Sequence, residues 1–126
     1  DIGVRGYGNT PAQAFEQAAL AMMAIIADLS LIQSRDEIAL HCADNDPEVL
    51  LTDWLNSLIY QISTRKMLFA RFEVKILNNR LSARAWGEAI DIERHQPAVE
   101  IKGATFTELA VRHTDDHWLA QCVVDV

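Results

Sequence analysis

The residues best suited to chemistry lie in and around one short polar stretch, where four charged or polar side chains fall between Asp91 and His95. Such a group could supply an acid, a base and a cation, as a small metal-dependent hydrolase would require. No recognisable nucleophile accompanies it, so the pattern favours a structural network in which Arg94 pairs with a carboxylate and His95 bonds to backbone. The candidate residues of this loop are Glu88, Asp91, Glu93, Arg94, His95, Glu100 and Lys102.

A second polar group lies near the end of the sequence, where His113 and His117 bracket Asp115 and Asp116. Histidine and carboxylate side chains bind transition metals, and two histidines facing each other across a hairpin could share an ion. No helix holds their spacing, however, and the intervening residues favour a turn. We therefore expect an exposed polar hairpin tip in preference to a metal site.

The composition indicates a single folded domain, residues 1–126, with an acidic surface. Half of the residues are hydrophobic, and the net charge is −7. This charge disfavours strong direct nucleic-acid binding, which requires a basic footprint, and favours a basic protein partner or a cation. The apolar run over residues 15–29 is too short and too interrupted to span a membrane, so no membrane association is expected. Cys42 and Cys122 are expected to be free thiols in a cytoplasmic protein.

Two segments carry the signals of amphipathic helices. The first, from about Pro11 to Leu29, begins with a threonine cap and a first-turn proline, and its apolar residues recur at helical spacing. The second, from about Pro47 to Ser63, follows a capping aspartate and has one apolar stripe. Core packing is the expected role of both apolar faces.

The other segments have strand character, and an Asn-Asn pair between two of them is typical of a tight hairpin turn. We expect an α+β domain of two layers, in which both helices cover one face of a mixed or antiparallel sheet of six to seven strands. The expected strands cover residues 1–8, 37–43, 66–77, 80–87, 99–102, 103–113 and 117–126.

The sequence around the polar loop resembles a known family. WGE at 86–88, D-x-x-x-H-x-P at 91–97 and VEIKxxTF at 99–106 are similar to the archease family, whose members are small acidic accessory proteins of the GTP-dependent RNA ligase of tRNA splicing. The opening DIGVRGYG and the closing AQCVVDV also resemble the two ends of archeases. The resemblance therefore covers nearly the whole chain and implies the archease fold.

The resemblance also implies a cation site at the two ends of the chain. In archeases the aspartate of the DIG motif, the C-terminal aspartate and the residue after it bind a divalent cation, and these correspond to Asp1, Asp125 and Val126. Oxygen ligands suit calcium, the expected ion, and also magnesium or manganese. Three residues cannot complete the six to eight ligands of calcium, so the site would be open. It also requires the first and last strands to lie side by side.

By resemblance, the chain would be a non-catalytic protein that promotes guanylylation and multiple turnover of the RNA-splicing ligase, in tRNA splicing or RNA repair. The loop residues would then dock the ligase. Many archeases have histidine where this chain has Thr107, so no role of that imidazole is expected here. Two alternatives remain: a chaperone or modulator of tRNA-modifying enzymes, and, less favoured, a metal-dependent hydrolase that uses the loop carboxylates.

Overall fold

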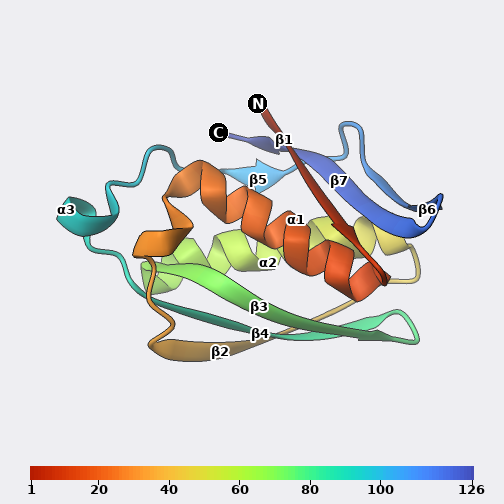
Figure 1. Cartoon of the computed structure of the whole chain (residues 1–126), viewed down its shortest axis with the longest axis horizontal. Helices are drawn as coiled ribbons and strands as arrows, with labels where there is room; N and C mark the ends of the chain where they lie inside the picture. Colours follow the sequence, from red (N-terminus) through yellow and green to blue (C-terminus); the bar gives the residue numbers. More distant parts are fainter.

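The computed structural model describes all 126 residues and shows two long helices between two antiparallel sheets (Figure 1). Sheet one comprises β1, β5, β6 and β7, and sheet two has the order β2–β4–β3. The elements in chain order are β1 (Ile2–Gly8), α1 (Pro11–Ile26), η1 (Leu29–Leu31), β2 (Asp36–Ala43), α2 (Pro47–Arg65), β3 (Met67–Leu77), β4 (Arg80–Ala89), α3 (Ile92–His95), β5 (Gly103–Ala104), β6 (Ala110–Thr114) and β7 (His117–Asp125).

The α+β class and the strand number agree with the sequence prediction, but the strands divide between two sheets instead of forming one. The width of the apolar surface of α1 explains the difference. Its buried residues occur as neighbouring pairs, such as Phe15 beside Ala14 and Met23 beside Met22, so the apolar surface is too wide for a single sheet to cover. Helix α1 accordingly contacts β1 and β7 of sheet one and β3 of sheet two.

Helix α1 and strand β1 pack very closely in the core. A Cβ atom at Gly6 would overlap the backbone of Ala14 and Ala18, so only glycine allows the helix to lie so near the strand. The two helices are joined by the buried indole of Trp54, which donates a hydrogen bond of 3.1 Å to the carbonyl of Phe15. These contacts fix α1 and the start of the chain relative to the rest of the core.

Several predicted boundaries are wrong. Residues 99–102 form no strand, because only Lys102 reaches a neighbouring strand, through one backbone hydrogen bond to β7, and only Ile101 is buried. The strand expected over residues 103–113 is interrupted after Ala104 by a turn, in which Glu108 has a φ of 53°. The first predicted helix ends early at Ile26 and is followed by η1, and the short helix α3 was not predicted.

The predicted turn at Asn78 and Asn79 is confirmed. Their φ angles are 51° and 63°, as the type I′ turn of a two-residue hairpin requires. The turn sets the register of β3 and β4, so that alternate residues from both strands lie on the same outer face of sheet two.

None of the helices combines the length and the hydropathy that crossing a membrane requires. Both cysteines are free thiols, as predicted. Cys122 lies in the core on β7, where burial raises its pKa to about 11. Cys42 is half-buried on β2, and burial also raises its pKa. Neither thiol is therefore activated as a nucleophile at neutral pH.

Candidate functional site

The two ends of the chain lie side by side, as the resemblance required. Strands β1 and β7 pair antiparallel with Ile2 opposite Val124, and the same register continued by one residue sets Asp1 opposite Asp125 (Figure 1). Directly opposed residues project from the same face of a sheet. Val124 is buried on the core side, so Asp1 and Asp125 project from the outer side, where both are exposed.

Strand β5 completes the surroundings of Asp125 from the other side of β7. Gly103 lies opposite Asp125, and the backbone N–H of Lys102 donates a 2.7 Å hydrogen bond to the Asp125 carbonyl. That hydrogen bond uses one lone pair of the carbonyl, whereas no hydrogen bond within the protein occupies the Asp125 carboxylate, so the carboxylate is the more available oxygen donor of Asp125 for a cation.

The donor set at the chain ends fits a hard cation only as an incomplete site. Asp1 and Asp125 offer carboxylate oxygens, the ligand type that calcium, magnesium and manganese prefer. No group of three or more His, Cys, Asp or Glu side chains, here or elsewhere in the molecule, is arranged to hold a metal ion by itself. An ion at these residues would consequently need water or a partner for its remaining ligands, in agreement with the open site expected from the sequence.

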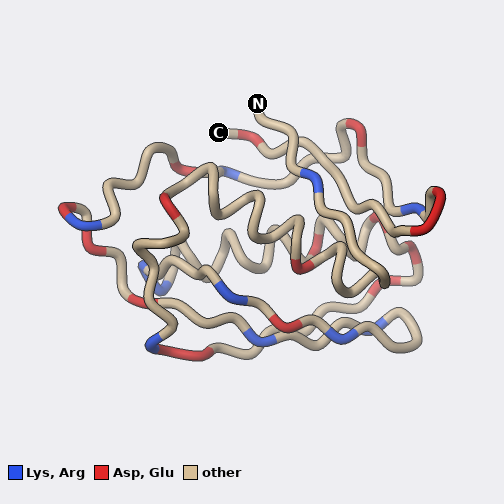
Figure 2. Tube along the Cα trace, in the orientation of Figure 1, with Lys and Arg blue, Asp and Glu red and all other residues tan.

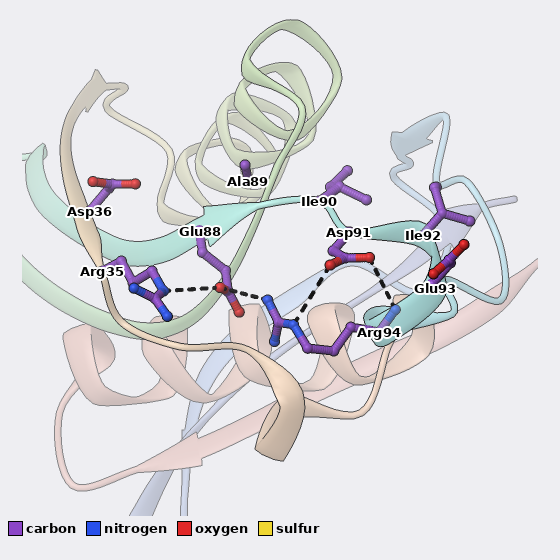
Figure 3. Close-up of a pocket in the computed structure, with 9 residues that line it drawn as sticks. All are labelled: Arg35, Asp36, Glu88, Ala89, Ile90, Asp91, Ile92, Glu93 and Arg94. Atoms are coloured by element: carbon purple, nitrogen blue, oxygen red, sulfur yellow. Dashed lines mark hydrogen bonds and ion pairs between the residues drawn. The ribbon is translucent and has the colours of Figure 1, made fainter.

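Glu88 is the centre of a second polar site, at the end of β4 beside α3 (Figure 3). Its side chain is only 5% exposed, and both oxygens of its carboxylate have ion-pair or hydrogen-bond partners within the protein. Oxygen Oε1 lies 2.7 Å from Arg94 Nη2 and 3.5 Å from Arg35 Nε. Oxygen Oε2 accepts from the Gln33 backbone N–H at 2.7 Å and lies 2.9 Å from His95 Nε2.

The hydrogen bonds of His95 determine its tautomer. Its Nδ1 atom lies 2.9 Å from the backbone nitrogen of Asp91, and because a backbone N–H can only donate, Nδ1 must accept. The ring hydrogen is then on Nε2 and is donated to Glu88. His95 is buried and acts as a neutral bridge between the start of α3 and the end of β4.

Arg94 joins the same network to the segment before β2. Its Nη1 donates a 2.6 Å hydrogen bond to the carbonyl of Leu31, and Asp91 caps α3 by accepting from the Arg94 backbone N–H. The pKa of Glu88 is lowered to about 2, mainly by the hydrogen bond from Arg94 and further by Gln33 and His95. A carboxylate that stays ionised at neutral pH is poorly suited to general acid–base work. The structural network expected from the sequence is thus confirmed.

The seven loop residues predicted from sequence do not form one cluster. Glu88, Asp91, Arg94 and His95 lie together, whereas Lys102 lies beside Asp125. Glu93 and Glu100 are exposed and form no ion pair. Sequence reasoning missed Arg35 and the backbone of Gln33, and no local signal pointed to either, because they are more than fifty residues from Glu88 along the chain.

The alternative metal site at His113 and His117 is excluded by the hairpin register. His117 pairs with Thr114, and His113 pairs with Trp118, so the two imidazoles project from opposite faces. The His117 ring packs against Tyr7, with ring centroids 5.1 Å apart, and His113 packs against Trp118 at 5.2 Å. The possibility that the two histidines face each other was wrong, and they cannot share an ion.

Comparison with known proteins agrees with this fold over its full length. The model of the Archease protein family matches residues 1–126. Protein archease of Pyrococcus furiosus is 37% identical over 131 residues, which cover 100% of this chain and 92% of that protein. Protein archease of Sulfolobus acidocaldarius is 34% identical over 128 residues, with the same coverage.

Solved structures give the same result. The solution structure of Methanobacterium thermoautotrophicum protein 1598 superposes with a TM-score of 0.86 at 33% identity, covering 98% of this chain and 91% of that one. The crystal structure of an archease from Thermotoga maritima, named a possible chaperone, has a TM-score of 0.69 at 20% identity and covers 100% and 91%. The second likeness concerns the fold alone. The chain belongs to the archease family.

Proposed function

We propose that this protein is a non-catalytic accessory factor of the GTP-dependent RNA-splicing ligase, and that it presents a divalent cation to the ligase. Family membership supports an accessory role in general terms. The proposed cation binding is supported mainly by the register of β1 and β7, which sets Asp1 and Asp125 opposite each other on an exposed face.

Asp1, Asp125 and Val126 would hold the ion. Calcium is the expected ion, with magnesium and manganese as alternatives. When bound, it supplies positive charge that can offset phosphate charge while the ligase takes up guanylate from GTP. The site is exposed and short of ligands, so a ligase side chain could complete it at the moment of contact. The polar loop around α3, with Glu93 exposed, would contribute to docking on a basic ligase surface.

Multiple-turnover RNA ligation by the cognate ligase, with manganese and GTP, tests this proposal. The assay compares the ligase alone, with the parent protein, with Asp125→Ala and with Asp115→Ala. Asp115 is an equally acidic residue in the β6–β7 turn, away from the chain ends, so its variant is the matched control. Stimulation by the parent and Asp115→Ala, but not by Asp125→Ala, is the expected result.

The other outcomes separate the two parts of the proposal. Equal stimulation by the parent and Asp125→Ala would keep the ligase as partner and reject the cation role. If neither stimulates ligation, the accessory role is rejected as well, and suppression of aggregation of a tRNA-modifying enzyme becomes the next activity to measure.

A further inference from the structure

The outer face of sheet two differs from the rest of this acidic molecule. It faces away from the helices, and the blue segments of Figure 2 follow β3 and β4 along it. Alternate residues of its three strands are exposed or half-exposed there, in rows set by the strand register. The rows are Ala43–Arg80–Leu77, His41–Ser82–Lys75, Ala39–Arg84–Glu73 and Glu37–Trp86–Arg71.

Charge is segregated on this face. It carries four of the eleven Lys and Arg residues, namely Arg71, Lys75, Arg80 and Arg84, against only two of the eighteen Asp and Glu residues. The net charge of −7 therefore conceals a local excess of positive charge. Such clustering on one face is the electrostatic footprint that nucleic-acid binding requires.

The half of the face nearest the β3–β4 turn is hollowed and free of carboxylates. A depression of about 600 Å³ is lined there by His41, Ala43, Lys75, Arg80 and Ser82, among others, and by no Asp or Glu. Lys75 and Arg80 form no ion pair within the protein. The small side chains of Ala43 and Ser82 are part of the lining, so an extended chain could approach the sheet between these unpaired cations.

The other half holds its cations in fixed positions. The guanidinium of Arg71 lies 4.2 Å from the centroid of the Trp86 ring and is ordered by that stacking. Arg84 is partly neutralised by Glu37, at 3.8 Å. The unpaired positive charge is therefore greatest at Arg80 and Lys75 near the turn, and Glu73 lies between it and Arg71.

We propose that this face binds the phosphodiester backbone of single-stranded RNA. Arginine, lysine, serine and histidine are donors suited to phosphate oxygens, and the row spacing presents them along an extended path. An acidic protein is the less suitable occupant, because protein interfaces rely on exposed apolar anchors. Here Leu77 is the one largely exposed apolar side chain, and Arg71 covers the face of Trp86. The inference does not rest on the ligase, since the isolated protein should bind RNA.

The acidic remainder of the surface limits the affinity. A contact confined to phosphates gives dissociation constants on the order of 10⁻⁴ to 10⁻⁶ M. Each neutralised phosphate of a single strand contributes about −0.7 to the slope of log K against log salt, so up to four cations predict a slope between about −2 and −3. Binding of this kind is compatible with the sequence-based expectation of no strong nucleic-acid binding.

Fluorescence polarisation of a short, unstructured, labelled RNA tests the proposal over about 50 to 200 mM salt. The parent is compared with Lys75→Glu/Arg80→Glu and with the matched control Arg65→Glu/Arg112→Glu. The control reverses two exposed cations on α2 and β6, outside the face, and leaves the same net charge. Circular dichroism establishes that all variants are folded.

The expected result is that Lys75→Glu/Arg80→Glu loses about tenfold or more in affinity and about 1.5 in salt slope, while the control stays within about twofold of the parent. Equal losses in both variants would show a response to net charge alone and would overturn the proposal. So would the absence of binding by the parent at the lowest salt. A polyaspartate peptide that competes as well as unlabelled RNA would identify a general acidic-protein surface and reject RNA as the occupant.

Discussion

Replacement of Glu88 by glutamine removes the carboxylate that joins β4, α3 and the segment before β2 with little change of shape. Glutamine can still accept a hydrogen bond from Arg94 through its one oxygen. Its amide nitrogen would then face both the His95 Nε2–H and the Gln33 N–H, so donors would oppose one another in a buried site. We expect Glu88→Gln to fold but to be clearly destabilised.

The magnitude follows from the shift in the Glu88 pKa, which falls from 4.5 to about 2 on folding. At about 1.4 kcal/mol per pKa unit, the charged form contributes at most about 3.5 kcal/mol at neutral pH. The side chains of Arg94 and Arg35 are 39% and 66% exposed, so solvent screens part of this, and about 2 kcal/mol is expected. That corresponds to a fall in Tm of about 8 °C.

Urea unfolding at several pH values is the assay, with Glu93→Gln as the control, because Glu93 is an exposed, unpaired carboxylate on the neighbouring helix α3. The folded-state pKa is depressed, so the contribution of Glu88 is complete above about pH 5 and is lost as the pH falls towards 2. The difference between the parent and Glu88→Gln should shrink over that range. A difference that is the same at about pH 3 as at neutral pH, or equal losses in Glu88→Gln and Glu93→Gln, would refute the reasoning.

Three further substitutions test the fold by urea unfolding. Gly6→Ala should lower the free energy of unfolding by about 3 kcal/mol, because its new methyl overlaps the backbone of α1. Gly3→Ala has open space around its methyl and should leave the stability nearly unchanged. Equal effects of the two substitutions would contradict the close packing of β1 against α1. Trp54→Phe should cost about 1 to 3 kcal/mol, because it removes the buried indole hydrogen bond to Phe15 and part of a fully buried ring, and no loss would contradict the packing of Trp54 between the helices. Asn79→Ala should cost about 1 kcal/mol in the left-handed turn, and a neutral result would contradict the type I′ geometry.

The local parts of the fold could be predicted from sequence, because caps and turns depend on neighbouring residues. Thr10 and Pro11 correctly located the start of α1, and Asn78–Asn79 located the hairpin. The division into two sheets could not be predicted, since it depends on which strands meet across the helices. Residues 99–102 alternate like a strand, but only Lys102 bonds to a neighbouring strand, and alternation alone cannot reveal that.

The polar sites could also be predicted only in part from the sequence. The pairing of the chain ends followed from the family resemblance, which located Asp1 opposite Asp125 without any structural information. Burial of Glu88 could not be predicted, because half of its partners lie on a distant segment. The basic face was present in the alternation of Arg71, Glu73 and Lys75 on β3, but the net charge of the whole chain obscured it.

The claim that matters most is that the two chain ends hold a divalent cation, and calorimetric titration of Ca²⁺ and Mn²⁺ into the isolated protein tests it most directly. We expect one site per chain, an affinity that falls about tenfold or more in Asp125→Asn, and no change in the Asp115→Asn control. No binding by the parent, or equal affinities for the parent and Asp125→Asn, would contradict it.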